Sequence, residues 1–119
     1  LNLIKKKLIK SAHDVSLGGI IVAIAKMCIK GKKGIKIKKT KQLINQFQYM
    51  FSEDQGRYIL EIKKENYKNV KEILNKSSVH YDEIGTVLDN DIVFEDKTKL
   101  SVDDLELSNN IWLKKYMEK

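Results

Sequence analysis

Proline is absent from this sequence, cysteine and arginine each occur once, and no apolar run is long enough to span a bilayer. Without proline, the turns must depend on glycine, asparagine and aspartate. A transmembrane helix needs about 20 consecutive apolar residues, whereas the most apolar stretch, residues 20–29, lies inside the chain and is much shorter. We therefore predict neither a signal peptide nor a membrane partner. One cysteine cannot form an internal disulfide, which favours a cytoplasmic location, and Cys28 is expected to be a small buried apolar residue.

The scarcity of arginine matters because the chain is strongly basic, with a formal net charge of +7. Of its 23 basic residues only Arg57 is an arginine, and the lysines are spread along the sequence. Nucleic-acid sites favour arginine, whose planar guanidinium forms paired hydrogen bonds with bases and phosphates. The densest lysine cluster, residues 30–41, is expected to be a solvated loop and edge strand. We predict no nucleic-acid partner; a non-catalytic basic module that binds nucleic acid or another anion is the alternative from a different class of function.

The hydrophobic pattern alternates between helical and strand periods over a length suited to one domain. Helices are expected at residues 3–10, 17–30, 41–49, 66–76 and from about 101 onward, and strands at residues 35–38, 57–63, 79–87 and 91–96, with a short strand before the last helix. Several strands follow one another directly, which favours an α+β fold with an open, mainly antiparallel sheet packed against helices. Residues 1–119 are interpreted as one domain, and Leu1 in place of methionine predicts a fragment of a longer chain.

Two adjacent glycines, Gly18 and Gly19, open the most apolar predicted helix, directly after the segment SAHDVSL. Ser16 is a residue type that often caps a helix N-terminus, so the three residues after it are expected to form the first helical turn. The amides of a first turn have no intrahelical partner and carry the positive end of the helix dipole. Because glycine lacks a Cβ, an anion could approach these amides closely. The motif therefore predicts a phosphate-binding helix start.

His13 and Asp14 precede this helix start and would add a titratable donor and a carboxylate near a bound anion. A second interpretation fits the same residues equally well. Glycines allow a helix to pack closely against its neighbours, and an aspartate in this region can simply cap the helix. Spacing alone leaves phosphate binding and helix packing as open alternatives.

The segment FSEDQGR, residues 51–57, holds a second polar group, formed by Glu53, Asp54 and Gln55. These residues lie in a predicted loop that leads into a strand, a position that often carries function. A polar turn before a strand is the commoner explanation. The sequence shows no Cys/His cluster with metal-ligand spacing, no phosphate loop of the Walker type and no complete nucleophilic triad. We therefore predict no metal site and assign no catalytic residue within these 119 residues.

Together, these segments resemble a known enzyme family. SAHDVSLGGIIVAIAKM is similar to the HDVSxGGLxVALAEM segment of phosphoribosylformylglycinamidine synthase, and FSEDQGRYILEI is similar to its FGEDQGRYLVEV segment. IGTVLDNDIVF and LSVDDLELSNNIWLKKYM match the closing strands and last helix of that family in order and spacing. The resemblance covers essentially the whole chain. It implies the C-terminal domain fold of the superfamily related to aminoimidazole ribonucleotide (AIR) synthase.

The resemblance implies an ATP-dependent ligase of purine biosynthesis, which converts formylglycinamide ribonucleotide and glutamine-derived ammonia into formylglycinamidine ribonucleotide. ATP and Mg²⁺ would be bound mainly outside this fragment, so the fragment alone is expected to be inactive. The lack of an attached glutaminase implies a small-type enzyme, supplied with ammonia by a separate glutaminase subunit and assisted by a small accessory subunit. The nearest alternative is another ATP-dependent member of the superfamily: selenophosphate synthetase, thiamine-phosphate kinase or a hydrogenase maturation factor.

By the same resemblance, Gly18 and Gly19 would hold the ribose phosphate of the ribonucleotide substrate. The residues that would line or support this site are His13, Asp14, Ser16, Glu53, Asp54 and Gln55. The last three form the second loop of the family motif, and the resemblance gives none of them an individual role. Two positions depart from the family, because Leu17 replaces an acidic residue and Ser52 replaces a glycine. Neither change removes the amides of the glycine pair.

Overall fold

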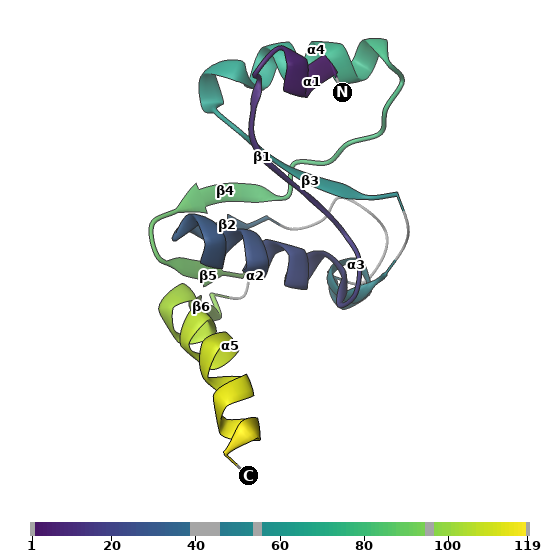
Figure 1. The fold of residues 1–119 in the computed structure, drawn as a ribbon. Coiled ribbons are helices and arrows are strands. Elements are labelled where there is room, and N and C mark those ends of the chain that lie inside the picture. The colour runs from purple at the N-terminus through teal and green to yellow at the C-terminus, as the bar shows by residue number, and fades with distance from the viewer. Residues whose placement is uncertain (1, 39–45, 54–55, 95–96, 119) are drawn as a thin grey trace.

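The computed structural model describes residues 2–38, 46–53, 56–94 and 97–118 (Figure 1). Its helices are α1 (Asn2–Lys5), α2 (Gly19–Gly31), α3 (Gln46–Phe51), the short 3₁₀-helix η1 (Lys64–Asn66), α4 (Tyr67–Lys76) and α5 (Val102–Met117). Its strands are β1 (Ile9–Asp14), β2 (Gly34–Ile37), β3 (Tyr58–Ile62), β4 (Gly85–Leu88), β5 (Asp91–Val93) and β6 (Lys99–Ser101). Figure 1 shows α5 extending away from the sheets at the end opposite α4.

The strands form two sheets. β1 and β3 pair antiparallel, with Ile9 opposite Ile62 at one end and Asp14 opposite Tyr58 at the other. The second sheet has the order β4-β2-β5-β6. In it, β2 pairs antiparallel with β4 and parallel with β5, and β5 pairs antiparallel with β6. The prediction of an α+β domain with mainly antiparallel pairing is confirmed, although the strands divide between two sheets.

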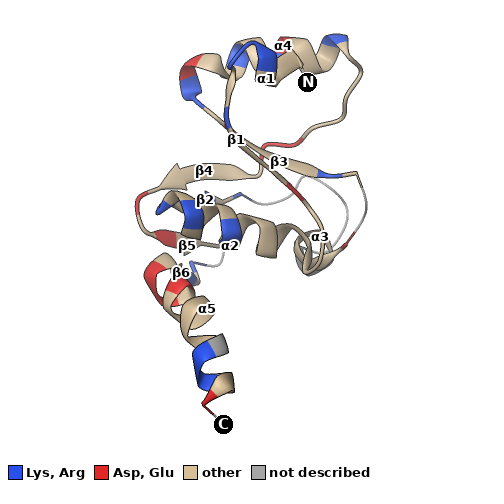
Figure 2. Ribbon diagram, in the orientation of Figure 1, with Lys and Arg blue, Asp and Glu red and all other residues tan. Residues whose placement is uncertain are grey.

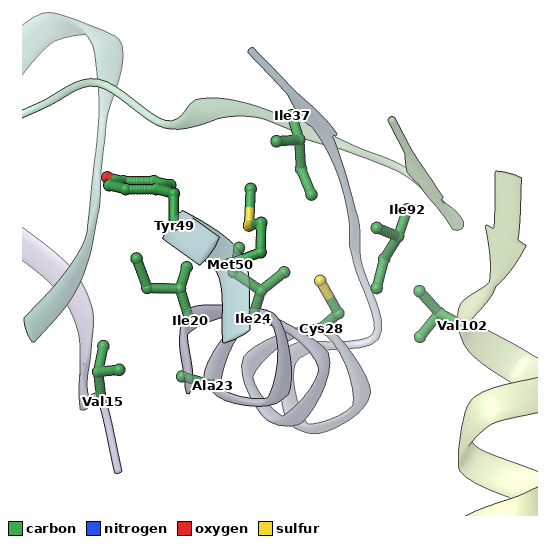
Figure 3. Close-up of a cluster of buried hydrophobic side chains, with 10 residues drawn as sticks. All are labelled: Val15, Ile20, Ala23, Ile24, Cys28, Ile37, Tyr49, Met50, Ile92 and Val102. Carbon is green, nitrogen blue, oxygen red and sulfur yellow. The ribbon is translucent and has the colours of Figure 1, made fainter. Parts of the chain in front are cut away.

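Helix α2 provides the centre of the hydrophobic core (Figure 3). Ile24 on this helix, Ile37 on β2 and Ile92 on β5 are each at most 2% exposed. Burying a side chain of this size contributes about 1.5–3 kcal/mol, so packing holds α2 against β2 and β5. Cys28 is buried, as predicted, and its burial raises the pKa of the thiol. The core cluster consists of Val15, Ile20, Ala23, Ile24, Cys28, Ile37, Tyr49, Met50, Ile92 and Val102.

The helix predicted at residues 3–10 is present only at its start. Helix α1 ends at Lys5, and residues Ile9–Asp14 form strand β1. The backbone of β3 needs a partner for its N–H and C=O groups, and β1 supplies it. Ser11 Oγ strengthens the pair by donating a 2.8 Å hydrogen bond to Glu61 Oε2. Long-range pairing of this kind overrides a local helical pattern.

Several other predicted elements are present. β3 and α4 match the predictions at residues 57–63 and 66–76, and β2 is shifted by one residue from the predicted 35–38. The last helix begins as predicted, because Ser101 Oγ accepts a 3.3 Å hydrogen bond from the amide of Asp104 and so caps α5.

Other predicted boundaries shift. The strand predicted at residues 79–87 forms only as β4, from Gly85 onward, and β5 ends at Val93. Of the helix predicted at residues 41–49, positions 41–45 lie outside the described residues, and α3 continues two residues further than predicted, to Phe51. Within the described ranges, no helix is both long and apolar enough to cross a membrane.

Candidate functional site

The two polar motifs of the sequence meet at the ends of β1 and β3. The first motif forms the turn between β1 and α2, and the second forms the loop between α3 and β3. Val15 N donates a 2.9 Å hydrogen bond to the carbonyl oxygen of Arg57, which extends the β1–β3 pairing into the turn. Gly18 N donates a 2.8 Å hydrogen bond to Glu53 Oε1. The structure therefore joins two segments that sequence reasoning could only describe separately.

Helix α2 begins later than predicted. Gly18 occupies the N-cap position, Gly19 is the first helical residue, and Leu17 and Gly18 do not belong to the helix. Ser16 does not cap the helix through its side chain; instead its carbonyl oxygen accepts a 3.0 Å hydrogen bond from Gly19 N. The physical reason is the backbone of the glycine pair, whose φ angles of +86° and +75° make a left-handed turn that closes through the main chain.

Both glycines are also required by close packing. A Cβ on Gly19 would lie 2.6 Å from the carbonyl oxygen of Met50 and 2.7 Å from the carbonyl carbon of Phe51. A Cβ on Gly18 would lie 2.3 Å from Val22 Cγ2. The structure thus gives the glycines the packing role that the sequence left open. Anion binding at their amides stays a prediction. It is compatible with this packing, because the contact with Met50 and Phe51 restricts the position of a side chain at residue 19 and not that of its amide.

Glu53 is the residue of the second motif that touches the glycine turn. Its side chain is exposed, and its carboxylate reaches the Gly18 amide at the N-terminal end of α2. A carboxylate in this position is stabilised by the N–H group and by the helix dipole. No individual role for Glu53 follows from the sequence, and in the structure its role is this contact. The other two residues of the predicted group, Asp54 and Gln55, lie outside the described residues.

Arg57 is a site residue that sequence reasoning missed. Its Nη2 donates a hydrogen bond to the carbonyl oxygen of Ser52, which ties the two ends of the loop together. Its Nε is buried and has no hydrogen-bond partner within the described part of the chain. The available signal was its identity as the single arginine in a lysine-rich sequence.

His13 and Asp14 lie at the end of β1, just before the glycine turn. His13 Nδ1 donates a 2.6 Å hydrogen bond to the carbonyl oxygen of Asp14 and lies 3.7 Å from Asp14 Oδ1. The side chain of Asp14 is 69% exposed, and Ser16 is also exposed. These three residues border the turn from the β1 side, and a role for them in ligand binding stays a prediction.

Large apolar side chains surround the turn and face solvent. Leu17 is 80% exposed, Phe51 is 56% exposed and Tyr58 is 71% exposed. They come from the turn before α2, the end of α3 and the start of β3, the three segments that build the site. The candidate site is therefore an open surface with apolar neighbours. The described residues would enclose a ligand bound here on one side only.

No metal site is found among the described residues. Among residues 2–38, 46–53, 56–94 and 97–118, no group of three or more His, Cys, Asp or Glu side chains could hold a metal ion. Two cavities lie away from the glycine turn. One of about 300 Å³ runs along α5 beside Leu107 and Trp112, and one of about 50 Å³ lies between Lys10 and Asn66.

The basic charge is distributed over the fold and mixed with acidic side chains. Figure 2 shows lysines on α1, α2 and α5; α5 also carries acidic residues, whereas α1 and α2 carry none. Lys10 pairs with Glu61 at 3.5 Å, and Lys38 pairs with Glu83. Such local pairing is typical of a solvated surface and gives little support to a nucleic-acid interface.

Known proteins are similar in sequence to this chain over nearly its whole length. Residues 1–97 match the family described as AIR synthase related protein, C-terminal domain. A phosphoribosylformylglycinamidine synthase subunit PurL from Pelagibacter ubique is 60% identical over 118 residues, which cover 99% of this chain and 16% of that protein. The corresponding subunit from Bartonella henselae is 39% identical over 116 residues, again 16% of its length. The chain thus spans about a sixth of the length of these curated relatives.

Solved structures show the same fold. Thermotoga maritima PurL complexed with FGAR matches 88% of this chain with a TM-score of 0.74 and 17% identity, over 19% of its own length. The structure of the same protein complexed with ATP matches 89% of this chain with a TM-score of 0.75 and 18% identity, over 20% of its own length. At this level of identity the likeness concerns the fold.

Proposed function

Because the chain belongs to the family of C-terminal domains of AIR synthase related proteins, we propose that it is part of a phosphoribosylformylglycinamidine synthase. The observation that carries this proposal is the 60% identity over 118 residues with the Pelagibacter ubique subunit PurL. The alignment with that subunit extends through α5, beyond the 97 residues that the family model matches. A shared domain fold alone would not require similarity in this last helix.

The proposed reaction joins ammonia to formylglycinamide ribonucleotide at the expense of ATP and yields formylglycinamidine ribonucleotide, ADP and phosphate. It is a ligase reaction, in which a carbon–oxygen bond of the amide is replaced by a carbon–nitrogen bond. No group of His, Cys, Asp or Glu side chains among the described residues could hold a metal ion, and we assign ATP and Mg²⁺ to other parts of the polypeptide. The contribution of this chain is substrate binding, and the 119 residues alone are expected to be inactive.

We assign the phosphate of the ribonucleotide to the turn between β1 and α2. Gly18 N supports this assignment, because it already binds a carboxylate oxygen at 2.8 Å and so presents its N–H group to an anion outside the turn. The dipole of the 13-residue helix α2 adds a positive potential at the same place. The residues proposed to border the phosphate are Gly18 and Gly19, supported by His13, Asp14, Ser16, Glu53, Asp54 and Gln55.

The open surface around the turn supports a site completed by other parts of the same polypeptide. Leu17, Phe51 and Tyr58 expose apolar area that a further domain could cover. We further propose a cytoplasmic enzyme that receives ammonia from a separate glutaminase subunit, with a small accessory subunit. The name of the relatives, which describes PurL as a subunit, supports the existence of partner subunits.

The test is an assay of the complete polypeptide that contains this chain, with ammonium chloride as the nitrogen donor. We expect ADP release that depends on formylglycinamide ribonucleotide, with formylglycinamidine ribonucleotide identified by mass spectrometry. Parallel assays replace the ribonucleotide with selenide or with thiamine phosphate. ADP release that is independent of the ribonucleotide, or faster with either replacement, would show that the proposed function is wrong.

A further inference from the structure

Helix α5 carries large apolar side chains that face solvent along most of its length. From residue 107 to residue 118, the described side chains are exposed, except that of Ile111, which is partly buried. Leu107 is 58% exposed, Trp112 65% and Tyr116 64%. Figure 1 shows this part of α5 extending away from the two sheets. Because a helix in a protein is stabilised mainly by the packing of its apolar face, this part of α5 needs a partner.

The exposed aromatic residues continue the side of α5 that packs on the core. Val102 is buried, and Leu105 packs against the core cluster. Trp112 follows Leu105 by seven residues and Tyr116 follows Trp112 by four, and both spacings keep side chains on one side of a helix. The rings of Trp112 and Tyr116 are stacked, with their centroids 5.7 Å apart. The apolar side of α5 is therefore longer than the core that covers its beginning.

A hollow of about 300 Å³ lies along the same part of the helix. Leu107 and Ile111, four residues apart, form a second apolar row beside the aromatic one. The hollow is lined by residues of both rows and by two polar side chains, which together are Leu107, Ser108, Ile111, Trp112 and Lys115. Grooves between rows of helix residues receive the side chains of a neighbouring element. We call the surface formed by Leu107, Ile111, Trp112 and Tyr116 the α5 face.

The size of the α5 face favours a partner on the same polypeptide. Its residues span about 14 Å along a helix about 10 Å across, so a contact with it buries on the order of a few hundred Å². A stable interface between separate proteins buries about 800 Å² on each partner. A tethered partner needs less contact area, because the linker keeps it at an effective concentration in the millimolar range.

The extent of the sequence similarity agrees with a partner of this kind. The family model matches residues 1–97 and ends before α5. The alignments with the two PurL subunits cover 99% and 98% of this chain and so extend over α5. The aligned residues are 16% of the Pelagibacter subunit, which leaves about five sixths of that polypeptide to provide a docking surface.

We propose that the α5 face docks on another domain of the same polypeptide, against an apolar surface outside residues 1–119. This inference rests on the proposed function only because it requires a longer polypeptide of the kind that the PurL subunits have. The α5 face is separate from the apolar side chains around the glycine turn, because it lies on a different helix. Docking at α5 holds this domain in a fixed orientation relative to the rest of the polypeptide.

Photo-cross-linking in the complete polypeptide tests which surface covers α5. The cross-linking amino acid benzoylphenylalanine replaces Ser108, which lines the hollow. The matched control places it at Asn110, an exposed residue about 200° further around the helix. After irradiation, we expect the probe at position 108 to be joined to residues of the same polypeptide outside residues 1–119, and the probe at position 110 to form no such link. Irradiation at about 0.5 µM and about 50 µM protein separates links within one polypeptide from links between copies.

Hydrogen–deuterium exchange of residues 107–117 in the complete polypeptide is the second measurement. Trp112→Ser removes the largest side chain of the α5 face, and Asn110→Ser is its control, since tryptophan, asparagine and serine have similar helix propensities. We expect exchange at least about tenfold faster in Trp112→Ser, because the loss of one buried apolar side chain shifts an opening equilibrium by that factor or more. Asn110→Ser should exchange as wild type does. Leu107→Ser should act in the same direction as Trp112→Ser, and thermal melting checks that all variants fold.

The outcomes separate this inference from the proposed function. Links within one polypeptide that form equally at both concentrations, without any other subunit, support the proposal. Links between copies, or protection of α5 only after a partner subunit is added, overturn it. An active synthase in which α5 is neither linked nor protected overturns the docking alone. A polypeptide that forms no amidine product, but whose α5 is linked to its other domains, overturns the proposed function and supports the docking.

Discussion

A Cβ on Gly19 would lie 2.6 Å from the main-chain carbonyl oxygen of Met50. The first residue of α2 and the end of α3 therefore approach each other with no room for a side chain at residue 19. Gly19 also has a φ of +75°, which residues with a Cβ rarely adopt. Because Glu53 follows α3 by two residues, this contact brings the second motif within reach of the Gly18 amide.

Gly19→Ala is expected to lower the free energy of unfolding by about 2–4 kcal/mol. The left-handed φ contributes about 1–2 kcal/mol, and the displaced main chain of Met50 contributes about as much again. Urea denaturation of the 119-residue chain, followed by circular dichroism, measures the change. Gly31→Ala is the control, since a Cβ there would have no neighbour within 4 Å, and it is expected to be neutral or stabilising by up to 1 kcal/mol. Equal stability of the two variants would contradict the packing role of Gly19.

Arg57 should contribute to stability through its contact with Ser52 rather than through an ion pair. Its Nη2 donates to the Ser52 carbonyl oxygen, and its Nε is buried without a partner in the described part of the chain. Arg57→Ala is expected to cost about 1–3 kcal/mol, because the carbonyl loses a charge-assisted hydrogen bond. Arg57→Lys should recover part of that loss. The same urea measurement applies, repeated at 0.5 M NaCl. A strong salt dependence of the difference would indicate an ion pair and contradict this assignment.

The elements predicted correctly are those whose local pattern agrees with their tertiary contacts. Helix α4 has one apolar face, centred on buried Val70, and α5 begins at a serine that caps it. Both signals are contained in the residues themselves. The run of strand-forming residues in β3 is of the same kind, and so is the buried position of Cys28 inside α2.

The elements predicted wrongly depend on partners far away in the sequence. Leu3, Ile4 and Leu8 follow a helical period that predicts a helix as far as residue 10, yet the backbone from Ile9 onward pairs with β3, about 50 residues later. The start of α2 was misplaced for a related reason. The contact of Gly19 with Met50 requires two left-handed glycines, so the turn closes through the main chain and Ser16 is not needed as a cap. The hydrogen bond from Gly18 to Glu53 joins two motifs that no local pattern could place together.

The stability of the chain should fall at low pH in part because of Glu83. Hydrogen bonds from Lys38 and from Tyr67 OH lower the pKa of this carboxyl below its ordinary value of 4.5. A carboxyl whose pKa is lower in the folded than in the unfolded state stabilises the fold, and this contribution is complete above the unfolded-state pKa. It is lost as the pH falls through the folded-state pKa. Because the side chain is 44% exposed, the contribution should be well below 1 kcal/mol.

Glu83→Gln therefore should reduce stability slightly at pH 7 and hardly at all at pH 3. Urea denaturation of both proteins at pH 7, 5, 4 and 3 measures the difference. Glu72→Gln makes an equal change of charge at an exposed residue of α4 and should show a smaller pH dependence. A difference between Glu83→Gln and wild type that stays constant from pH 7 to pH 3 would contradict the effect of Lys38 and Tyr67.

The net charge of +7 should not produce functional binding to nucleic acid. Its lysines are spread over the fold and several of them pair with carboxylates, as Lys33 does with Asp89 at 3.7 Å. Fluorescence anisotropy with a labelled DNA duplex should show weak binding at 20 mM salt that disappears near 150 mM, since such contacts depend steeply on salt. Saturation below about 1 µM at 150 mM salt would favour the nucleic-acid alternative.

Cys28 should be unreactive as long as the chain is folded. The side chain is 7% exposed inside the core, and burial, followed by the nearby charge of Glu61, raises the pKa of its thiol. Both effects oppose formation of the thiolate, which is the reactive species. Reaction with a disulfide reagent at pH 8 should therefore be slow in buffer and at least about 100-fold faster in 8 M urea. Unfolding must precede the reaction, so the rate in buffer should increase for Gly19→Ala, which is less stable, and should not increase for Gly31→Ala. Rapid labelling of the folded wild type would show that the face of α2 around Cys28 opens, and would contradict a core held together by Ile24, Ile37 and Ile92.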